Sequence, residues 1–192
     1  GSGFAVKSYQ VHPDLGGNEA LIRFRERLKQ YGLKLMLDFV PNHMAPDHAW
    51  IEQHPDYFIQ GTRADLENNS RNFTQAGHNN TARVFAYGRD PYFDGWPDTL
   101  QLDYSNAAVT DAMTQELQRI STQCDGLRCD MAMLVMPAVF EKTWGRKMKS
   151  FWPEAIKAVK ETIPDFTFMA EVYWEMEWDL QQTGFDYTYD KS

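Results

Sequence analysis

Residues 124–132 read CDGLRCDMA, a short apolar run that carries an arginine and an aspartate close to its end. A run of this length and composition is typical of a buried strand. Side chains two positions apart in a strand point to the same face, so Arg128 and Asp130 are predicted to enter the same interior. Because buried charges must be paired, this stretch predicts a charged cluster inside the fold.

Two other segments repeat this pattern of an apolar strand with an acid toward its end. They are 33–40 (LKLMLDFV), with Asp38, and 166–172 (FTFMAEV), with Glu171. Helical patterns separate these segments, and this alternation predicts an α/β fold with a parallel sheet. The expected helices are 18–31, 106–123, 153–162 and 174–183, and a fourth strand is expected at 184–189.

The acids of these strands are expected to converge, because active sites of parallel α/β folds lie at the carboxyl ends of the strands. Arg128 can bridge Asp38 and Asp130, and an arginine that close would keep the Asp130 carboxylate ionised. Glu171 has no positive neighbour in the sequence, and an apolar setting would raise its pKa and keep it protonated. The alternative for each acid is a capping or ion-pair residue.

One ionised and one protonated carboxyl on neighbouring strands suggest a specific chemistry. Neighbouring strands lie about 4.8 Å apart, and a carboxyl pair about 5–5.5 Å apart is the geometry of a retaining glycoside hydrolase. His43, Tyr173 and Trp174, together with Tyr92 and Trp96, could hydrogen-bond to a sugar or stack on it. The alternative for each aromatic ring is packing in the core.

Composition restricts the class of protein and its partners. The 192 residues are 43% hydrophobic and 14% aromatic, with a net charge of −8, so a core can form. An acidic chain repels phosphate backbones, so no nucleic-acid partner is expected. No stretch approaches the roughly 18 apolar residues of a membrane span, so no membrane partner is expected either. Cys124 and Cys129 fit no metal or redox motif and are expected to be buried thiols.

The segment 44–104 differs from the rest of the chain. It has little periodicity, and a connection that long inside a compact unit is usually functional. We expect a small inserted subdomain on the C-terminal side of the sheet. Its turn-forming residues are Pro46, Pro55, Gly61, Gly77, Gly88, Pro91, Gly95 and Pro97.

Four motifs together resemble a known family. The segments DFVPNH (38–43), GLRCDMA (126–132) and FMAEVYW (168–174) resemble the first three conserved blocks of the alpha-amylase family, glycoside hydrolase family 13. TLQLDYSN (99–106) resembles the short block that closes the inserted B domain of that family. The motifs follow the family order, and the resemblance covers nearly the whole chain.

The resemblance implies a partial (β/α)8 TIM barrel, with strands three to six and a B-domain-like loop region inserted after strand three. A full barrel needs about 250 residues, so the chain is expected to be a fragment without the first two and last two strands. The family's fourth block, with its third catalytic aspartate, lies beyond this sequence. The expected parts are a barrel part at 1–43, the inserted region at 44–104 and a second barrel part at 105–192.

The resemblance also implies roles for individual residues. Asp130 matches the nucleophile, Glu171 the general acid/base and Arg128 the arginine that orients the nucleophile. His43 matches a histidine that contacts the sugar. The remaining matches are Asp38, the structural aspartate of the first block, and Asn42, which in the family often ligates calcium.

Two departures from the family pattern qualify this assignment. Gln101 stands where many members have a calcium-binding aspartate, so no cofactor is expected to be required, and calcium at Asn42 is left as an alternative. Met133 and Leu134 replace a lysine and a histidine that many amylases use beyond the cleavage point, which affects binding of the acceptor sugar.

The expected function is a retaining glycoside hydrolase that acts on alpha-glucosidic bonds of starch-like glucans or maltooligosaccharides, with the fragment alone inactive. One alternative is a transglycosylase, or a sucrose- or trehalose-acting relative that uses the same residues. The other is a non-catalytic carbohydrate-binding homologue, although such a copy has no reason to retain Arg128, Asp130 and Glu171 together.

Overall fold

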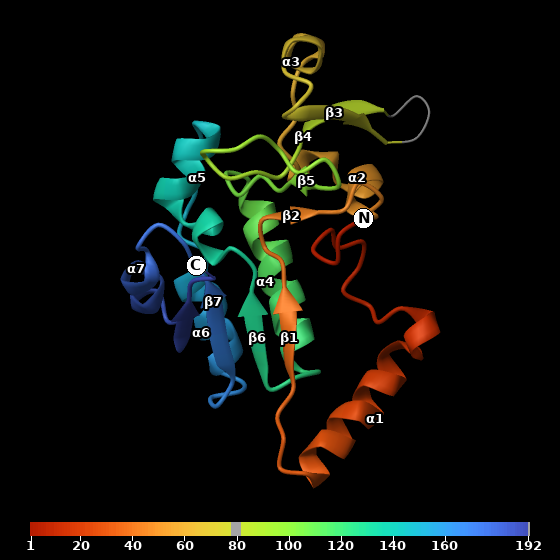
Figure 1. The fold of residues 1–192 in the computed structure, drawn as a ribbon, viewed down its shortest axis with the longest axis vertical. Helices are drawn as coiled ribbons and strands as arrows, with labels where there is room; N and C mark the ends of the chain where they lie inside the picture. The colour runs from red at the N-terminus through yellow and green to blue at the C-terminus, as the bar shows by residue number, and fades with distance from the viewer. Residues whose placement is uncertain (78–81, 192) are drawn as a thin grey trace. The chain divides into compact units, whose positions relative to one another are not determined.

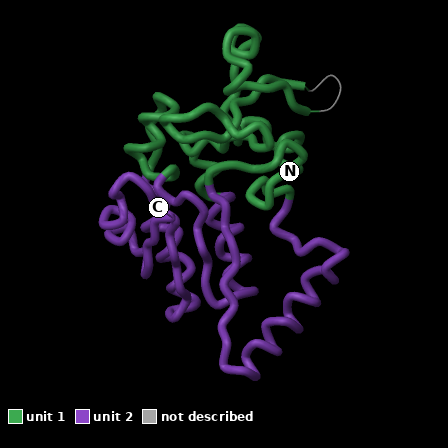
Figure 2. The backbone as a smooth tube through the Cα atoms, in the orientation of Figure 1, with its two compact units in different colours: residues 1–7, 42–111, 134–149 green, residues 8–41, 112–133, 150–192 purple. Residues whose placement is uncertain are grey.

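The computed structural model describes residues 1–77 and 82–191, and the chain forms two compact units (Figure 2). Each unit is assembled from segments that are distant in the sequence. The predicted division at residues 43 and 104 stays a prediction. Unit 1 comprises residues 1–7, 42–111 and 134–149, and unit 2 comprises residues 8–41, 112–133 and 150–192.

A four-stranded sheet, in which every pairing is parallel, forms the centre of unit 2 (Figure 1). This confirms the predicted α/β class with a parallel sheet. In the register, Asp38 pairs with Arg128, and Glu171 pairs with Tyr189. The strand order is β1 (Met36–Phe39), β6 (Gly126–Cys129), β7 (Thr167–Glu171) and β8 (Tyr187–Tyr189).

Helices α4 and α6 pack on this sheet because their apolar residues repeat at helical spacing. Met113, Leu117 and Ile120 of α4 are buried, as are Ile156 and Val159 of α6. In the described part of the chain, no helix combines the length and apolar character needed to cross a membrane. The helices that contribute to unit 2 are η1 (Pro13–Leu15), α1 (Gly17–Gln30), α4 (Ala107–Ser121), α6 (Trp152–Lys160) and α7 (Glu177–Gln182).

Helix α1 is present as predicted, but none of its residues is fully buried. Ile22 and Phe24, on its predicted apolar face, are 56% and 51% exposed. The helix is held instead by Arg25, whose guanidinium donates to Asp125 at 2.7 Å and to the Thr122 carbonyl at 2.8 Å. Polar anchoring therefore positions α1 in the described chain, not burial of its apolar residues.

Unit 1 contains more regular structure than the sequence predicted for 44–104. Its strands form two small antiparallel sheets, β2 with β5 and β3 with β4. Strands of two to four residues are too short to give a periodic pattern, which explains the difference. The elements are β2 (His43–Met44), α2 (Trp50–Gln53), η2 (Pro55–Tyr57), α3 (Arg63–Asn68), β3 (Phe73–Ala76), β4 (Arg83–Ala86), β5 (Leu100–Gln101) and α5 (Pro137–Trp144), and η4 (Ala132–Val135) joins the two units along the chain.

The sheet predicts one specific sensitivity, at Gly126 in β6. A Cβ atom there would lie 2.8 Å from the Thr167 carbonyl oxygen and 3.1 Å from the Met36 side chain, so the neighbouring strands would have to move. We expect Gly126→Ala to lower the free energy of unfolding by about 2 kcal/mol, measured by denaturant unfolding. Gly3→Ala is the control, because no atom lies within 4 Å of its added Cβ. Equal stability of the two variants would contradict the described strand packing.

Candidate active site

The Arg128 guanidinium is the centre of a cluster that includes side chains from all four strands of unit 2. Its Nη1 donates to Asp38 Oδ1 at 3.1 Å and to Asp130 Oδ1 at 2.9 Å. Its Nη2 donates to Glu171 Oε2 at 2.6 Å, and its Nε donates to the Tyr189 hydroxyl at 2.8 Å. We call these five residues the Arg128 cluster.

Strand geometry explains why these side chains meet. Asp38 on β1 lies directly beside Arg128 in the register, and Asp130 follows β6 two positions after Arg128, on the same face. Both ion pairs expected for Arg128 are present. The Asp38 side chain is 57% exposed, whereas those of Asp130 and Glu171 are 9% and 7% exposed. Asp130 and Glu171 are therefore the two buried acids of the cluster.

The surroundings of Glu171 differ from the expectation. The sequence predicted an apolar setting without a positive neighbour, but Arg128, 43 positions away in the sequence, contacts one carboxylate oxygen. The same oxygen accepts a hydrogen bond from the Met131 backbone N–H at 3.1 Å, and the other accepts one from the Tyr173 hydroxyl at 2.8 Å. Three donors thus hold the Glu171 carboxyl group in place.

The expectation for Asp130 is also wrong. Burial raises the pKa of Asp130 to about 7, although Arg128 acts in the opposite direction. The negative charge of Glu171 and a hydrogen bond between the two carboxyl groups raise this pKa further. Burial outweighs one arginine here because that arginine is shared among three acids. Asp130 therefore keeps its proton to a higher pH than an isolated aspartate would.

The backbone next to each buried acid has an uncommon conformation. Met131, after Asp130, has φ 40°, and Trp174 and Glu175, after Glu171, have φ 65° and 60°. Such left-handed conformations are costly for residues other than glycine and concentrate at functional sites. At Met131 this conformation accompanies the N–H that contacts Glu171. Burial, followed by the hydrogen bond to Glu171, raises the pKa of Tyr173 to about 12, so its hydroxyl stays a donor.

His43, expected to contact the sugar, belongs to unit 1. Its Nε2 lies 3.2 Å from the Phe4 carbonyl oxygen, its Nδ1 lies 3.2 Å from Asn42 Nδ2, and its ring packs against Trp96. Burial lowers the pKa of His43 to about 4, so the ring is neutral near pH 7. These partners fix the tautomer with the proton on Nε2, because the Phe4 carbonyl can only accept. The role of His43 toward a sugar stays a prediction.

The surroundings of Asn42 do not fit a calcium ion. Its amide forms two 3.0 Å hydrogen bonds with the Gln101 amide, one in each direction, and both side chains are buried. Calcium takes six to eight oxygen ligands, including carboxylates, whereas this contact consists of paired neutral amides. In the described part of the chain, no group of three or more His, Cys, Asp or Glu residues could hold a metal ion.

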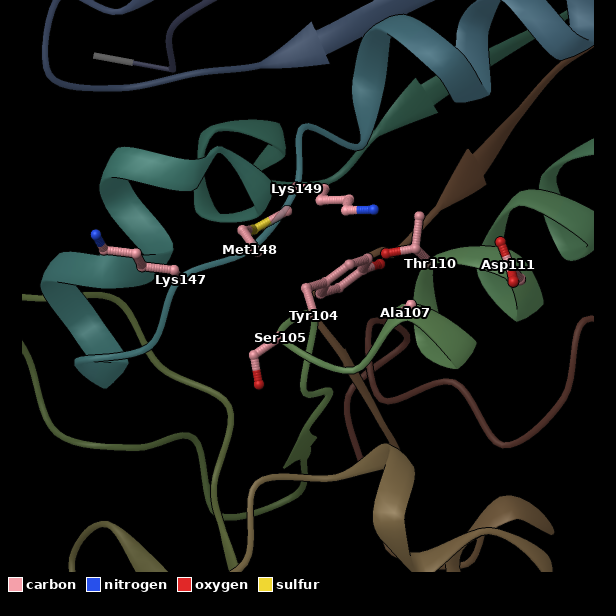
Figure 3. A pocket seen from close by; sticks show the side chains of 8 residues that line it. All are labelled: Tyr104, Ser105, Ala107, Thr110, Asp111, Lys147, Met148 and Lys149. Carbon is pink, nitrogen blue, oxygen red and sulfur yellow. The ribbon is translucent and has the colours of Figure 1, made fainter.

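Unit 1 also contains a pocket of about 590 Å³, shown in Figure 3. The side chains of Tyr104 and Lys149 point toward Thr110, whereas those of Lys147 and Asp111 point away. Asp111 is the only carboxylate that lines this pocket, so it lacks the acid pair found in the Arg128 cluster. The Arg128 cluster therefore remains the candidate active site.

This cluster has the groups needed for a two-carboxylate reaction. It combines two buried acids, a raised pKa at Asp130, a cation that contacts both acids and a set of fixed donors to Glu171. Pairs of titratable groups with different environments are the usual arrangement for acid, base and nucleophile roles.

Comparison with known proteins identifies the family. The family model "Alpha amylase, catalytic domain" matches residues 2–188, nearly the whole chain. The chain belongs to the alpha-amylase family. The family members with solved structures include an alpha-amylase from Lactobacillus plantarum, with a TM-score of 0.66 and 25% sequence identity over 96% of this chain.

Curated relatives in the alpha-amylase family include transferases as well as hydrolases. Alpha-1,4-glucan:maltose-1-phosphate maltosyltransferase 2 of Streptomyces coelicolor is 25% identical over 93% of this chain. Maltase A1 of Drosophila melanogaster is 40% identical over 25% of this chain. The chain spans 36% of the Lactobacillus enzyme, 23% of the maltosyltransferase and 8% of the maltase.

Two groups that belong to the site were not predicted from the sequence. One is Tyr189, whose hydroxyl contacts Arg128, and the other is the Met131 backbone N–H. Tyr189 gave a usable signal, because it ends the fourth predicted strand where the acids of the other strands lie. The Met131 contact gave no sequence signal, because the direction in which a backbone N–H points cannot be read from the residue type.

The coupled acids predict a pH-dependent effect of Asp130→Asn on stability. In the folded state the pKa of Asp130 is raised to about 7, above its ordinary value of 3.8. Its protonated form therefore stabilises the fold below about pH 4, and this contribution is lost as the pH rises through about 7. Because asparagine does not ionise, we expect the variant to be more stable than the wild type by about 2 kcal/mol at about pH 8 and similar to it at about pH 4.

Thermal and denaturant unfolding of the 192-residue chain at both pH values would test this prediction. Asp38→Asn is the matched control, because this acid contacts the same arginine but is largely exposed. We expect a change below about 0.5 kcal/mol for the control at either pH. A larger stabilisation by Asp130→Asn at the lower pH would contradict the described proton balance.

Proposed function

We propose that the chain supplies the nucleophile and the general acid/base of a retaining enzyme that acts on alpha-glucosidic bonds. Asp130 is the nucleophile, Glu171 the general acid/base, and Arg128 orients both. The single observation that carries this proposal is the cluster in which Arg128 contacts both buried acids, at 2.9 Å and 2.6 Å. A non-catalytic homologue is disfavoured because it would gain nothing from two buried acids around one arginine.

The proposed reaction has two steps. In the first, an Asp130 oxygen bonds to the anomeric carbon while Glu171 donates its proton to the glycosidic oxygen, which leaves as a hydroxyl. In the second, water or a sugar hydroxyl attacks the glycosyl ester, Glu171 takes the proton, and the Asp130 carboxylate is released. Water gives hydrolysis, and a sugar hydroxyl gives transglycosylation.

Burial raises the pKa of Asp130 to about 7 in the free cluster, whereas the reaction requires the proton on Glu171. In that cluster Glu171 accepts hydrogen bonds from three donors. A sugar bound between the two carboxyl groups would break the hydrogen bond between them. It would also bring their separation to about 5–5.5 Å, the distance found in retaining enzymes. The glycosidic oxygen would then be the partner of protonated Glu171.

The proposed substrate is an alpha-glucan or maltooligosaccharide, the substrate class of the alpha-amylase family. Transfer is the second candidate, because a maltosyltransferase aligns with 93% of the chain. Met133 and Leu134, which follow the nucleophile segment, are buried apolar residues. They offer no polar side chain to an acceptor sugar, so other parts of the enzyme would select water or sugar. His43, Tyr173 and Trp174 are proposed to contact the bound sugar.

We also propose that the four parallel strands correspond to strands three to six of an eight-stranded barrel. Residues 44–104 would then correspond to the B domain inserted after strand three. The coverage of 36% of the Lactobacillus amylase supports a role as part of a larger catalytic domain. Strands β1 and β8 are the sheet edges at which the other strands would pair.

The assigned nucleophile predicts the effect of Asp130→Asn on catalysis in an enzyme that contains the whole catalytic domain. An amide does not form the glycosyl ester, so we expect turnover to fall by at least about 10⁴-fold. Release of reducing sugar from starch and maltooligosaccharides is the measurement, and Asp14→Asn is the control, because the Asp14 side chain is 88% exposed and lies outside the Arg128 cluster. Near-normal turnover by the Asp130 variant would show that the nucleophile lies elsewhere.

The partial barrel predicts that residues 1–192 alone lack useful glycosidase activity. Stabilisation of the transition state needs a preorganised site from which bulk water is excluded. Four strands do not enclose such a site. We expect reducing-sugar release at least about 10³-fold below that of an intact amylase assayed alongside. The same chain with Asp130→Asn is the blank. Turnover well above this blank and close to that of the amylase would show that the other strands are dispensable.

A further inference from the structure

The fourth strand contributes a residue to the Arg128 cluster to which neither the family blocks nor the proposed reaction gives a role. We propose that Tyr189 is a positioning residue for the reaction, because its hydroxyl holds the Arg128 guanidinium so that both buried carboxyls are contacted at once. This inference rests on the proposed function and adds a residue to the same site. Tyr189 acts through Arg128 and touches no reacting atom.

The edges of the guanidinium explain this role. Nε and Nη2 form one edge, and an arginine commonly uses that edge to bind a single carboxylate with two parallel hydrogen bonds. Here Nη2 donates to Glu171 at 2.6 Å, while Nε donates to the neutral Tyr189 hydroxyl at 2.8 Å. The hydroxyl therefore takes the place of a second Glu171 oxygen, and Nη1 stays with Asp130 at 2.9 Å.

The backbone of β8 fixes the hydroxyl in this position. Tyr189 pairs with Glu171 in the parallel register, and its carbonyl accepts the Val172 N–H at 3.0 Å. The Tyr189 ring centroid lies 5.9 Å from Arg128 Cζ, within the range of a cation–π contact. A phenylalanine would keep the ring and lose only the hydroxyl.

Without the hydroxyl, Nε would lose its neutral acceptor beside the negatively charged Glu171. The guanidinium would turn to bind Glu171 with both Nε and Nη2, and Nη1 would move away from Asp130. Asp130 would then lose the cation that contacts it at 2.9 Å. The other titratable groups near this contact include Asp38 on β1, Tyr173 after β7 and Asp190 after β8.

The test is Tyr189→Phe in an enzyme that contains the whole catalytic domain, assayed on maltooligosaccharides across pH. We expect kcat to fall about 10-fold with KM within about 2-fold, because the lost contact serves the reacting groups and not the sugar. The acidic limb of the pH profile should move up by about half a unit or more, because Asp130 ionises less readily. A merely structural tyrosine would not shift this limb.

Tyr187→Phe is the matched control, because it removes a hydroxyl two positions away on the same strand from a ring that is 62% exposed. This control should leave kcat and the pH profile unchanged. In a second measurement, Arg128→Lys removes the Nε donor, and in that background Tyr189→Phe should change kcat by less than about 2-fold.

The outcomes separate the positioning role of Tyr189 from the proposed function. An unchanged pH profile in Tyr189→Phe, or an equal loss of kcat in the Arg128→Lys background, would overturn the positioning role while leaving the proposed function intact. A wild-type enzyme without activity on any alpha-glucoside would overturn the proposed function itself and this role with it. Non-additive unfolding temperatures of the same two variants would still report the contact without any activity assay.

Discussion

The guanidinium of Arg128, whose side chain is 15% exposed, joins the four strands of the parallel sheet. A buried charge is tolerated only when its donors are satisfied, and here the acceptors come from β1, the end of β6, β7 and β8. A slip of one residue in any pairing would turn an acceptor to the opposite face of the sheet. The cluster therefore specifies the register as well as the chemistry.

The same constraint sets the electrostatics of the site. One cation is shared among three acids, and at Asp130 the effect of burial outweighs it. The result is a raised pKa at Asp130, near residues in left-handed conformations at Met131 and Trp174. Strain and perturbed pKa values at one place are costs to stability that functional sites commonly carry. The two central strands, β6 and β7, carry buried apolar residues beneath the site, among them Leu127, Phe168 and Ala170.

The family relationship limits what the cluster alone can specify. Retaining hydrolases and transglycosylases share the first step and differ in the acceptor of the second, so the acids and the arginine are common to both. The residues that follow the nucleophile segment here, Met133 and Leu134, are buried and apolar. Choice of acceptor therefore depends on other parts of the enzyme, in keeping with relatives whose names include both a maltosyltransferase and a maltase.

The sequence by itself determined the parallel sheet and brought Arg128 together with the acids Asp38, Asp130 and Glu171. Local hydrophobic patterns define the strands, and strand alternation places Arg128 and Asp130 on one face, so both features were predictable. Only the tertiary structure decided the protonation of the acids, because pKa values depend on burial and on contacts between residues far apart in the chain. Arg128 reaches Glu171 across 43 positions, and Tyr189 completes the contact from the fourth strand. Contacts between residues so far apart in the sequence are not encoded in any local pattern, so the raised pKa of Asp130 followed from packing alone.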